Sequence, residues 1–271
     1  MDNRSIGVFD SGLGGLTAVK QIMRELPCES IVYFGDTGRV PYGTRSEETI
    51  IKYSKNDVNF LIEKEVKLIV VACGTVSSVA LSTLKKEYDI PIIGVVEAAT
   101  DAAISKTKNG KIGIIGTQGT IKSGSYEKLI KQINPEIETF SAACPLFVPL
   151  VENGHFDTPV AKLVIEEYLA PIKKEGVDTL ILGCTHYPLI RDTIEKVMGD
   201  EVTLVNPAYE TARELKELLA ERSLLNEKPI GLGEDGHSFY VSDAAEKFQV
   251  FANSILKYGI LSAKIVNAEK Y

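Results

Sequence analysis

The sequence predicts an α/β fold of two similar halves with mostly parallel sheets. Three observations support this. Short apolar runs alternate with segments of helical spacing. Several runs are β-branched and apolar on both faces, as buried parallel strands are. Two motifs also recur in the same order along the chain. We expect two pseudo-symmetric α/β domains with the active site in the cleft between them.

The expected elements alternate from the N-terminus onward. The strands are Ile6–Phe9, Ile31–Phe34, Leu68–Ala72, Ile92–Val95, Ile112–Ile115, Glu136–Phe140, Leu180–Leu182 and Val202–Val205. The helices between them are Thr17–Glu25, Glu47–Lys64, Val76–Glu87, Ser125–Ile133, Pro159–Glu175 and Leu189–Val197. A tail follows with a helix at Tyr209–Glu221, a glycine-rich loop at Gly231–Gly236 and a helix at Asp243–Lys257.

The repeated motifs indicate how the halves are built. Residues 6–11 resemble residues 112–117, and residues 68–75 resemble residues 179–186. Chance similarity between apolar strands is the alternative. If the repeat is real, each half places a cysteine just past the carboxyl end of a strand, where open α/β sheets bind ligands. We expect residues 1–97 and 208–271 to form the first domain, because the tail is too short to fold alone, and residues 98–207 the second.

Composition limits the partners and the compartment. The chain has 271 residues and a formal net charge of −7, which argues against a nucleic acid or an anionic membrane as the main partner. It begins without a signal-peptide pattern and has no apolar run long enough to span a bilayer. We therefore predict a cytoplasmic protein, in which thiols stay reduced.

Two of the four cysteines stand out. Cys73 and Cys184 each follow an apolar run and precede hydroxyl residues, so each is expected at a strand-to-helix turn, where a helix N-terminus favours a thiolate. Cys28 and Cys144 show no such pattern and are expected to be packing residues. Cys184 and His186 alone are too few ligands for a metal site, so we predict no metal.

Two thiols facing one substrate suit racemisation. One base removes the Cα proton, and an acid on the opposite face returns a proton. A single cysteine nucleophile with His186 as its base leaves Cys73 unexplained. A two-lobed amino-acid binding protein and a thiol redox protein are further alternatives.

Three loops could hold the substrate. Residues 10–16 form a glycine-rich turn, which either binds a carboxylate or is only a tight turn, and Asp10 in it could pair with an ammonium group or cap a helix. Thr117 lies in the corresponding loop of the second half, again as ligand or helix cap. Tyr42 and Gly43 either line a pocket or belong to a surface turn. Glu152 is of interest only if the second half folds it towards the cleft.

These motifs together resemble glutamate racemases, within the aspartate/glutamate racemase superfamily. The motifs are D-S-G-L-G-G at 10–15, P-Y-G at 41–43, V-A-C-G-T at 71–75, P-I-I-G-V at 91–95, G-T-x-x-T at 116–120 and G-C-T-H-Y-P at 183–188. They occur in order through nearly the whole chain. One position departs from the pattern, because the family usually has Asn where this chain has Gly74.

The resemblance implies a racemase that needs no cofactor, acts on glutamate as its small-molecule substrate, supplies D-glutamate for peptidoglycan synthesis and forms a homodimer. Racemisation of aspartate or another amino acid is the alternative. By this analogy Cys73 deprotonates the D-enantiomer and Cys184 the L-enantiomer, with Asp10, His186 and Glu152 assisting. The residues expected to bind substrate are Asp10, Ser11, Tyr42, Gly43, Gly74, Thr75, Thr117, Thr185 and His186.

Overall fold

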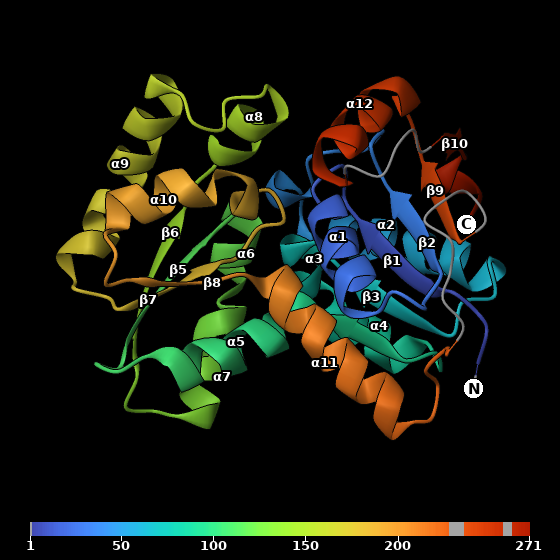
Figure 1. Cartoon of the computed structure of the whole chain (residues 1–271), viewed down its shortest axis with the longest axis horizontal. Helices are drawn as coiled ribbons and strands as arrows, with labels where there is room; N and C mark the ends of the chain where they lie inside the picture. Colours follow the sequence, from blue (N-terminus) through green and yellow to red (C-terminus); the bar gives the residue numbers. More distant parts are fainter. Residues whose placement is uncertain (1, 228–235, 257–261) are drawn as a thin grey trace.

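Two parallel sheets, each flanked by helices, form the protein (Figure 1). The computed structural model describes residues 2–227, 236–256 and 262–271. One sheet has the strand order β10-β9-β2-β1-β3-β4 and the other β6-β5-β7-β8, and every strand pair is parallel. The predicted α/β class with parallel sheets is therefore confirmed. Among the described residues no helix is long and apolar enough to cross a membrane.

The elements of the first sheet and its helices come first. They are β1 (Ile6–Asp10), α1 (Leu16–Glu25), β2 (Ile31–Gly35), η1 (Tyr42–Thr44), α2 (Glu47–Glu63), β3 (Leu68–Val71), α3 (Gly74–Val79), α4 (Leu81–Glu87) and β4 (Ile92–Gly94). The second sheet follows with α5 (Val95–Lys106), β5 (Lys111–Gly116), α6 (Gln118–Ser123), α7 (Ser125–Ile133), β6 (Glu138–Ala143), α8 (Phe147–Glu152), α9 (Pro159–Lys174), β7 (Thr179–Leu182), η2 (Tyr187–Ile190), α10 (Arg191–Met198) and β8 (Thr203–Val205).

The internal repeat is visible in the strand order. The order β2-β1-β3-β4 in the first sheet corresponds to β6-β5-β7-β8 in the second. The registers correspond as well, because Ile6 pairs with Leu68 and Ile112 pairs with Thr179. The sequence repeat aligned these same positions. Each half therefore places a cysteine beyond the carboxyl end of the corresponding strand, β3 in the first half and β7 in the second.

The tail returns to the first sheet. It contains α11 (Pro207–Glu221), β9 (His237–Val241), α12 (Ala245–Leu256), β10 (Ala263–Ile265) and η3 (Ala268–Lys270). Strand β9 pairs with β2 and extends the first sheet, while α11 packs against both α1 and α5. The predicted glycine-rich loop at 231–236 and the end of the helix predicted to Lys257 lie outside the described residues, apart from Gly236. The domain boundaries stay a prediction.

Several elements differ from the sequence-based expectation. The helix predicted over Val76–Glu87 is two helices that meet at Ala80, because apolar periodicity does not separate one helix from two in succession. The strand predicted at Glu136–Phe140 lies at Glu138–Ala143, in register with β5. Helix α5 was missed because most of its residues are small or apolar, and its polar face is only the narrow stripe of Glu97, Asp101 and Ser105.

Candidate active site

Cys73 and Cys184 occupy corresponding places in the two halves. Each lies two residues beyond the last residue of its strand, Cys73 after β3 and Cys184 after β7. Both side chains are nearly buried. Both also line one cavity of about 330 Å³, a size suited to a small ligand. The structure therefore brings the two predicted thiols to a single cavity built by both halves.

The cavity also contains nearly all the other predicted site residues. They are Ser11, Tyr42, Gly43, Gly74, Thr75, Thr117, Glu152, Thr185 and His186. Asp10 is the exception, because its side chain is fully buried below the glycine-rich turn and does not line the cavity. Its carboxylate accepts hydrogen bonds from the Gly12 amide at 3.0 Å and the Thr185 hydroxyl at 3.5 Å. In this structure Asp10 acts on the site through these neighbours.

The Cys73 thiol lies in an environment that keeps it protonated. Burial, together with the nearby carboxylate of Asp10, raises the pKa of Cys73 to about 12. The thiol donates a hydrogen bond to the Ser11 hydroxyl oxygen at 3.3 Å. At neutral pH Cys73 is therefore a proton donor towards the cavity, and once deprotonated it is a strong base.

The Cys184 side belongs to a chain of charged groups. The His186 Nδ1 atom lies 3.9 Å from the Cys184 sulfur, and His186 Nε2 lies 3.2 Å from a Glu152 carboxylate oxygen. Burial by itself lowers the pKa of His186, but the hydrogen bonds to Cys184 and Glu152 outweigh it and raise the pKa to about 10. The hydrogen bond from His186 also lowers the pKa of Glu152 to about 2. A charged imidazolium beside the Cys184 sulfur stabilises negative charge there.

The glycine-rich turn at 10–15 brings the halves close together. A Cβ atom on Gly14 would lie 2.3 Å from the Thr185 hydroxyl and 2.5 Å from His186 Nδ1, so only glycine fits. The Thr17 hydroxyl donates to the Thr185 carbonyl at 2.9 Å across the same contact. These contacts favour a packing role for Gly14. Gly12 of the same turn does line the cavity.

The P-Y-G loop lines the cavity, but its tyrosine points its hydroxyl elsewhere. Tyr42 is buried, and its hydroxyl donates to Asp36 and, at 3.2 Å, to Asp57. Arg39 also contacts both carboxylates, at 2.6 Å and 3.1 Å. The backbone of Gly43 lies against Thr117, which leaves no room for a side chain at position 43. Tyr42 therefore anchors the loop through its hydroxyl while the loop itself borders the cavity.

Two further contacts join the halves at the cavity. The hydroxyls of Thr75 and Thr117 are 2.9 Å apart, and Thr117 also caps α6 by accepting from the Thr120 amide. A Cβ atom on Gly74 would lie only 2.4 Å from the Gly183 carbonyl oxygen. The loop after β3 and the loop after β7 are thus in direct backbone contact beside the thiols.

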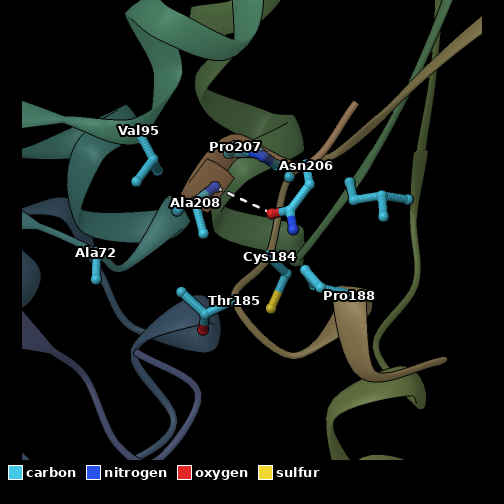
Figure 2. A pocket seen from close by; sticks show the side chains of 11 residues that line it. Ala72, Val95, Cys184, Thr185, Pro188, Asn206, Pro207 and Ala208 are labelled. Carbon is cyan, nitrogen blue, oxygen red and sulfur yellow. Dashed lines mark hydrogen bonds between the residues drawn. The ribbon is translucent and has the colours of Figure 1, made fainter. Parts of the chain in front are cut away.

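Behind Cys184 the packing is tight and largely apolar. A second cavity of only about 10 Å³ lies there, bordered by Ala72, Val95 and Pro188 (Figure 2). Asn206 lies on its wall and caps α11 by accepting from the Ala208 amide at 3.1 Å, drawn as a dashed line in Figure 2. This wall supports the Cys184 loop from behind, and Cys184 reaches the larger cavity on its other side.

Comparison with known proteins decides the family. The sequence pattern of the Asp/Glu/Hydantoin racemase family matches residues 15–215. The chain belongs to the Asp/Glu/Hydantoin racemase family. It is 47% identical over 269 residues to the glutamate racemase of Geobacter metallireducens, covering 98% of each chain. The glutamate racemase of Thermoanaerobacter pseudethanolicus is 45% identical, covering 100% of each.

Solved structures of glutamate racemases superpose closely on this chain. The racemase superposes with a TM-score of 0.94 on glutamate racemase isoform RacE1 from Bacillus anthracis, at 40% identity and covering 98% of each chain. It superposes with a TM-score of 0.92 on the Francisella tularensis glutamate racemase in complex with D-glutamate, at 39% identity and covering 100% of each. The predicted resemblance and the prediction of an enzyme of the isomerase class are confirmed.

Sequence reasoning missed part of the racemase cavity. The missed lining residues are Gly12, Val40, Pro41, Thr44, Gln118, Cys144, Pro145, Val148, Pro149 and Asn153. Cys144 was expected to be a packing residue; it is buried and also borders the cavity. No sequence signal pointed to it, because the predicted strand ended at Phe140, whereas β6 runs to Ala143, directly before Cys144. Among the described residues no group of three or more His, Cys, Asp or Glu side chains is placed to hold a metal ion.

Proposed function

We propose that this racemase interconverts L- and D-glutamate by transferring protons with Cys73 and Cys184, without a cofactor. The observation that carries the proposal is the placement of the two thiols at corresponding strand ends of two repeated halves, bordering one cavity. The substrate follows from the relatives, which are named glutamate racemases, and from the Francisella tularensis structure in complex with D-glutamate.

The proposed reaction needs one thiolate and one thiol at the start of each turnover. A thiolate on one side of the substrate takes the Cα proton and becomes a thiol, while the thiol on the other side delivers its proton and becomes a thiolate. With Cys73 protonated and an imidazolium beside Cys184, the ground state suits proton removal by Cys184, the direction proposed for L-glutamate. The opposite direction starts after Cys73 has lost its proton.

The remaining groups support this exchange. Ser11 accepts from the Cys73 thiol and could hold that sulfur in line with the substrate. The hydroxyls of Thr75, Thr117 and Thr185, with the free amides at the start of α3 and α6, offer donors for substrate carboxylates. Closure of both halves around the substrate would exclude water, which strengthens these interactions as negative charge develops on the substrate.

We further propose a cytoplasmic, homodimeric enzyme whose D-glutamate enters peptidoglycan synthesis. The cytoplasm suits the mechanism, because the mechanism needs two free thiols and thiols stay reduced in that compartment. All four cysteines are unpaired in the structure. The dimer and the peptidoglycan role rest on the resemblance alone. Light scattering of the purified protein tests the dimer, and rescue of a depleted strain by added D-glutamate tests the role.

The test of the reaction uses purified protein in heavy water with no added cofactor. Circular dichroism and deuterium at Cα are followed together on D-glutamate, L-glutamate and D-aspartate. Loss of optical activity with deuterium entering Cα of glutamate supports the proposal. A reduced, folded protein that exchanges only aspartate, or neither amino acid, contradicts the proposed substrate.

A further inference from the structure

A lysine of the C-terminal segment contacts Glu152, which lines the cavity together with Cys184 and His186. Lys247 lies on α12, which packs against α1 and β10 in the half built on the first sheet. Its ammonium nitrogen lies 3.0 Å from a Glu152 carboxylate oxygen at the end of α8, which belongs to the other half. Figure 1 shows α12 and α8 facing each other from the two sides of the molecule. This ion pair therefore joins the two halves.

Glu152 is the second of four side chains in contact with one another in series. One of its oxygens accepts from Lys247, and the other pairs with His186 Nε2 at 3.2 Å. His186 in turn lies 3.9 Å from the Cys184 sulfur through Nδ1. The series therefore runs from an exposed lysine to one of the two reacting sulfurs.

The exposure of each member distinguishes this contact from an ordinary surface ion pair. The Lys247 side chain is 57% exposed, whereas that of Glu152 is 19% exposed and that of His186 only 8%. An ion pair with so exposed a lysine contributes little to stability. Its effect on the orientation of Glu152 is larger, because a carboxylate held at both oxygens has one orientation available to it.

We propose that Lys247 is a positioning residue of the racemase: by holding Glu152 from the opposite half, it fixes the His186 ring against Cys184 when the two halves are together. This inference rests on the proposed function, because it assigns Cys184 a reacting role. It links closure of the two halves to the position of the His186 ring beside one thiol. The opposite thiol, Cys73, has no such contact with α12 among the described hydrogen bonds.

The charged surroundings of His186 define what loss of Lys247 should do. The ionisable groups that act on His186 are Cys184 on its own loop, Glu152 from α8 and Asp10 from β1. Helix α12 also places the Phe251 ring 6.3 Å from the imidazole. Removing a distant positive charge alone would raise the pKa of His186. Releasing Glu152 from its position would lower it towards the ordinary value of 6.5. Loss of charge alone and loss of positioning therefore predict opposite changes in the His186 pKa.

The test compares Lys247→Met, Lys247→Arg and Lys196→Met with the parent enzyme. Lys196 is the matched control, because its side chain is 62% exposed and pairs with Asp157 at 3.3 Å away from the cavity. The chain has three histidines, so His186 can be followed by NMR titration of its imidazole protons and assigned with His186→Asn. The kcat/KM for glutamate is measured over the same pH range.

In Lys247→Met we expect the His186 pKa to fall and kcat/KM to drop about 10-fold, less than complete loss of an acid–base group would cost. Lys247→Arg should retain both values, and Lys196→Met should change neither. A His186 titration in Lys247→Met that matches the parent, or one that shifts upward, overturns the proposal. Absence of glutamate turnover in the parent enzyme would instead contradict the proposed function, and the titration would still decide whether Lys247 positions the histidine.

Discussion

Gly74 is a position where one added methyl group would press on the backbone directly beside both thiols. A Cβ atom there would lie 2.4 Å from the Gly183 carbonyl oxygen, whereas ordinary van der Waals contact begins at 3.4 Å. The Gly183 oxygen belongs to the backbone, and the position of the Cβ atom is fixed by the backbone of residue 74. No side-chain rotation can therefore relieve the clash. In Gly74→Ala the loops that carry Cys73 and Cys184 must therefore separate by about 1 Å.

This separation has two measurable consequences. Overpacking of this kind costs about 1–3 kcal/mol of stability. Misplacing reacting groups by about 1 Å can lower a rate by about 10²-fold. We therefore expect a lower kcat for racemisation with a modest fall in Tm. Gly74→Asn, which introduces the residue usual in the family, meets the same carbonyl and should also lose rate in this chain.

The assay is the initial rate of racemisation by circular dichroism, together with the thermal unfolding of each variant. Gly38→Ala is the control, because its Cβ would meet the side chain of Ser242 at 3.2 Å, outside the cavity. It should keep a near-parental rate. A Gly74→Ala enzyme with parental kcat and parental Tm would refute the reasoning that this contact sets the spacing of the two loops.

Three further predictions follow from the site. Cys73→Ser and Cys184→Ser should each fold normally and lose at least about 10²-fold in racemisation rate in both directions, and a variant with near-parental rates would contradict its thiol's role. His186 holds a proton in the folded state up to a pKa of about 10, so stability should fall as pH rises above about 7, by about 1.4 kcal/mol per pH unit; denaturant unfolding should show this slope reduced in His186→Asn. Tyr42→Phe removes a donor from two buried carboxylates and should lower the free energy of unfolding by about 1–3 kcal/mol, while an unchanged Tm would contradict the anchoring role.

The sequence predicted the fold class and the thiol pair because both depend on local patterns. Buried parallel strands are continuous apolar runs, and the repeat of the strand that precedes each cysteine survives in the sequence. The same repeat appears in the pairing of Ile6 with Leu68 and Ile112 with Thr179. Helix α5 escaped prediction because its polar face is only a narrow stripe, Glu97, Asp101 and Ser105, in an otherwise small and apolar segment.

The parts of the site that the sequence could not show depend on contacts between distant segments. Glu152 meets His186 only because α8 folds against the loop after β7. Asp10 is buried, and the Tyr42 hydroxyl donates hydrogen bonds to two aspartates. Both are tertiary features that residue type alone does not indicate. Lys247 carried no motif at all, since an exposed lysine on an amphipathic helix is common on protein surfaces.

The most direct test of the two-thiol mechanism follows the Cα hydrogen at low conversion in heavy water. L-glutamate and D-glutamate are each incubated separately with the enzyme, and deuterium is measured by mass spectrometry in the product and in the unreacted substrate. Because one thiol removes the proton and the other delivers one from solvent, the product should be deuterated while the unreacted substrate stays protiated, from either enantiomer. A product that keeps the hydrogen of its substrate, or substrate that gains deuterium faster than product forms, would contradict two opposed thiols.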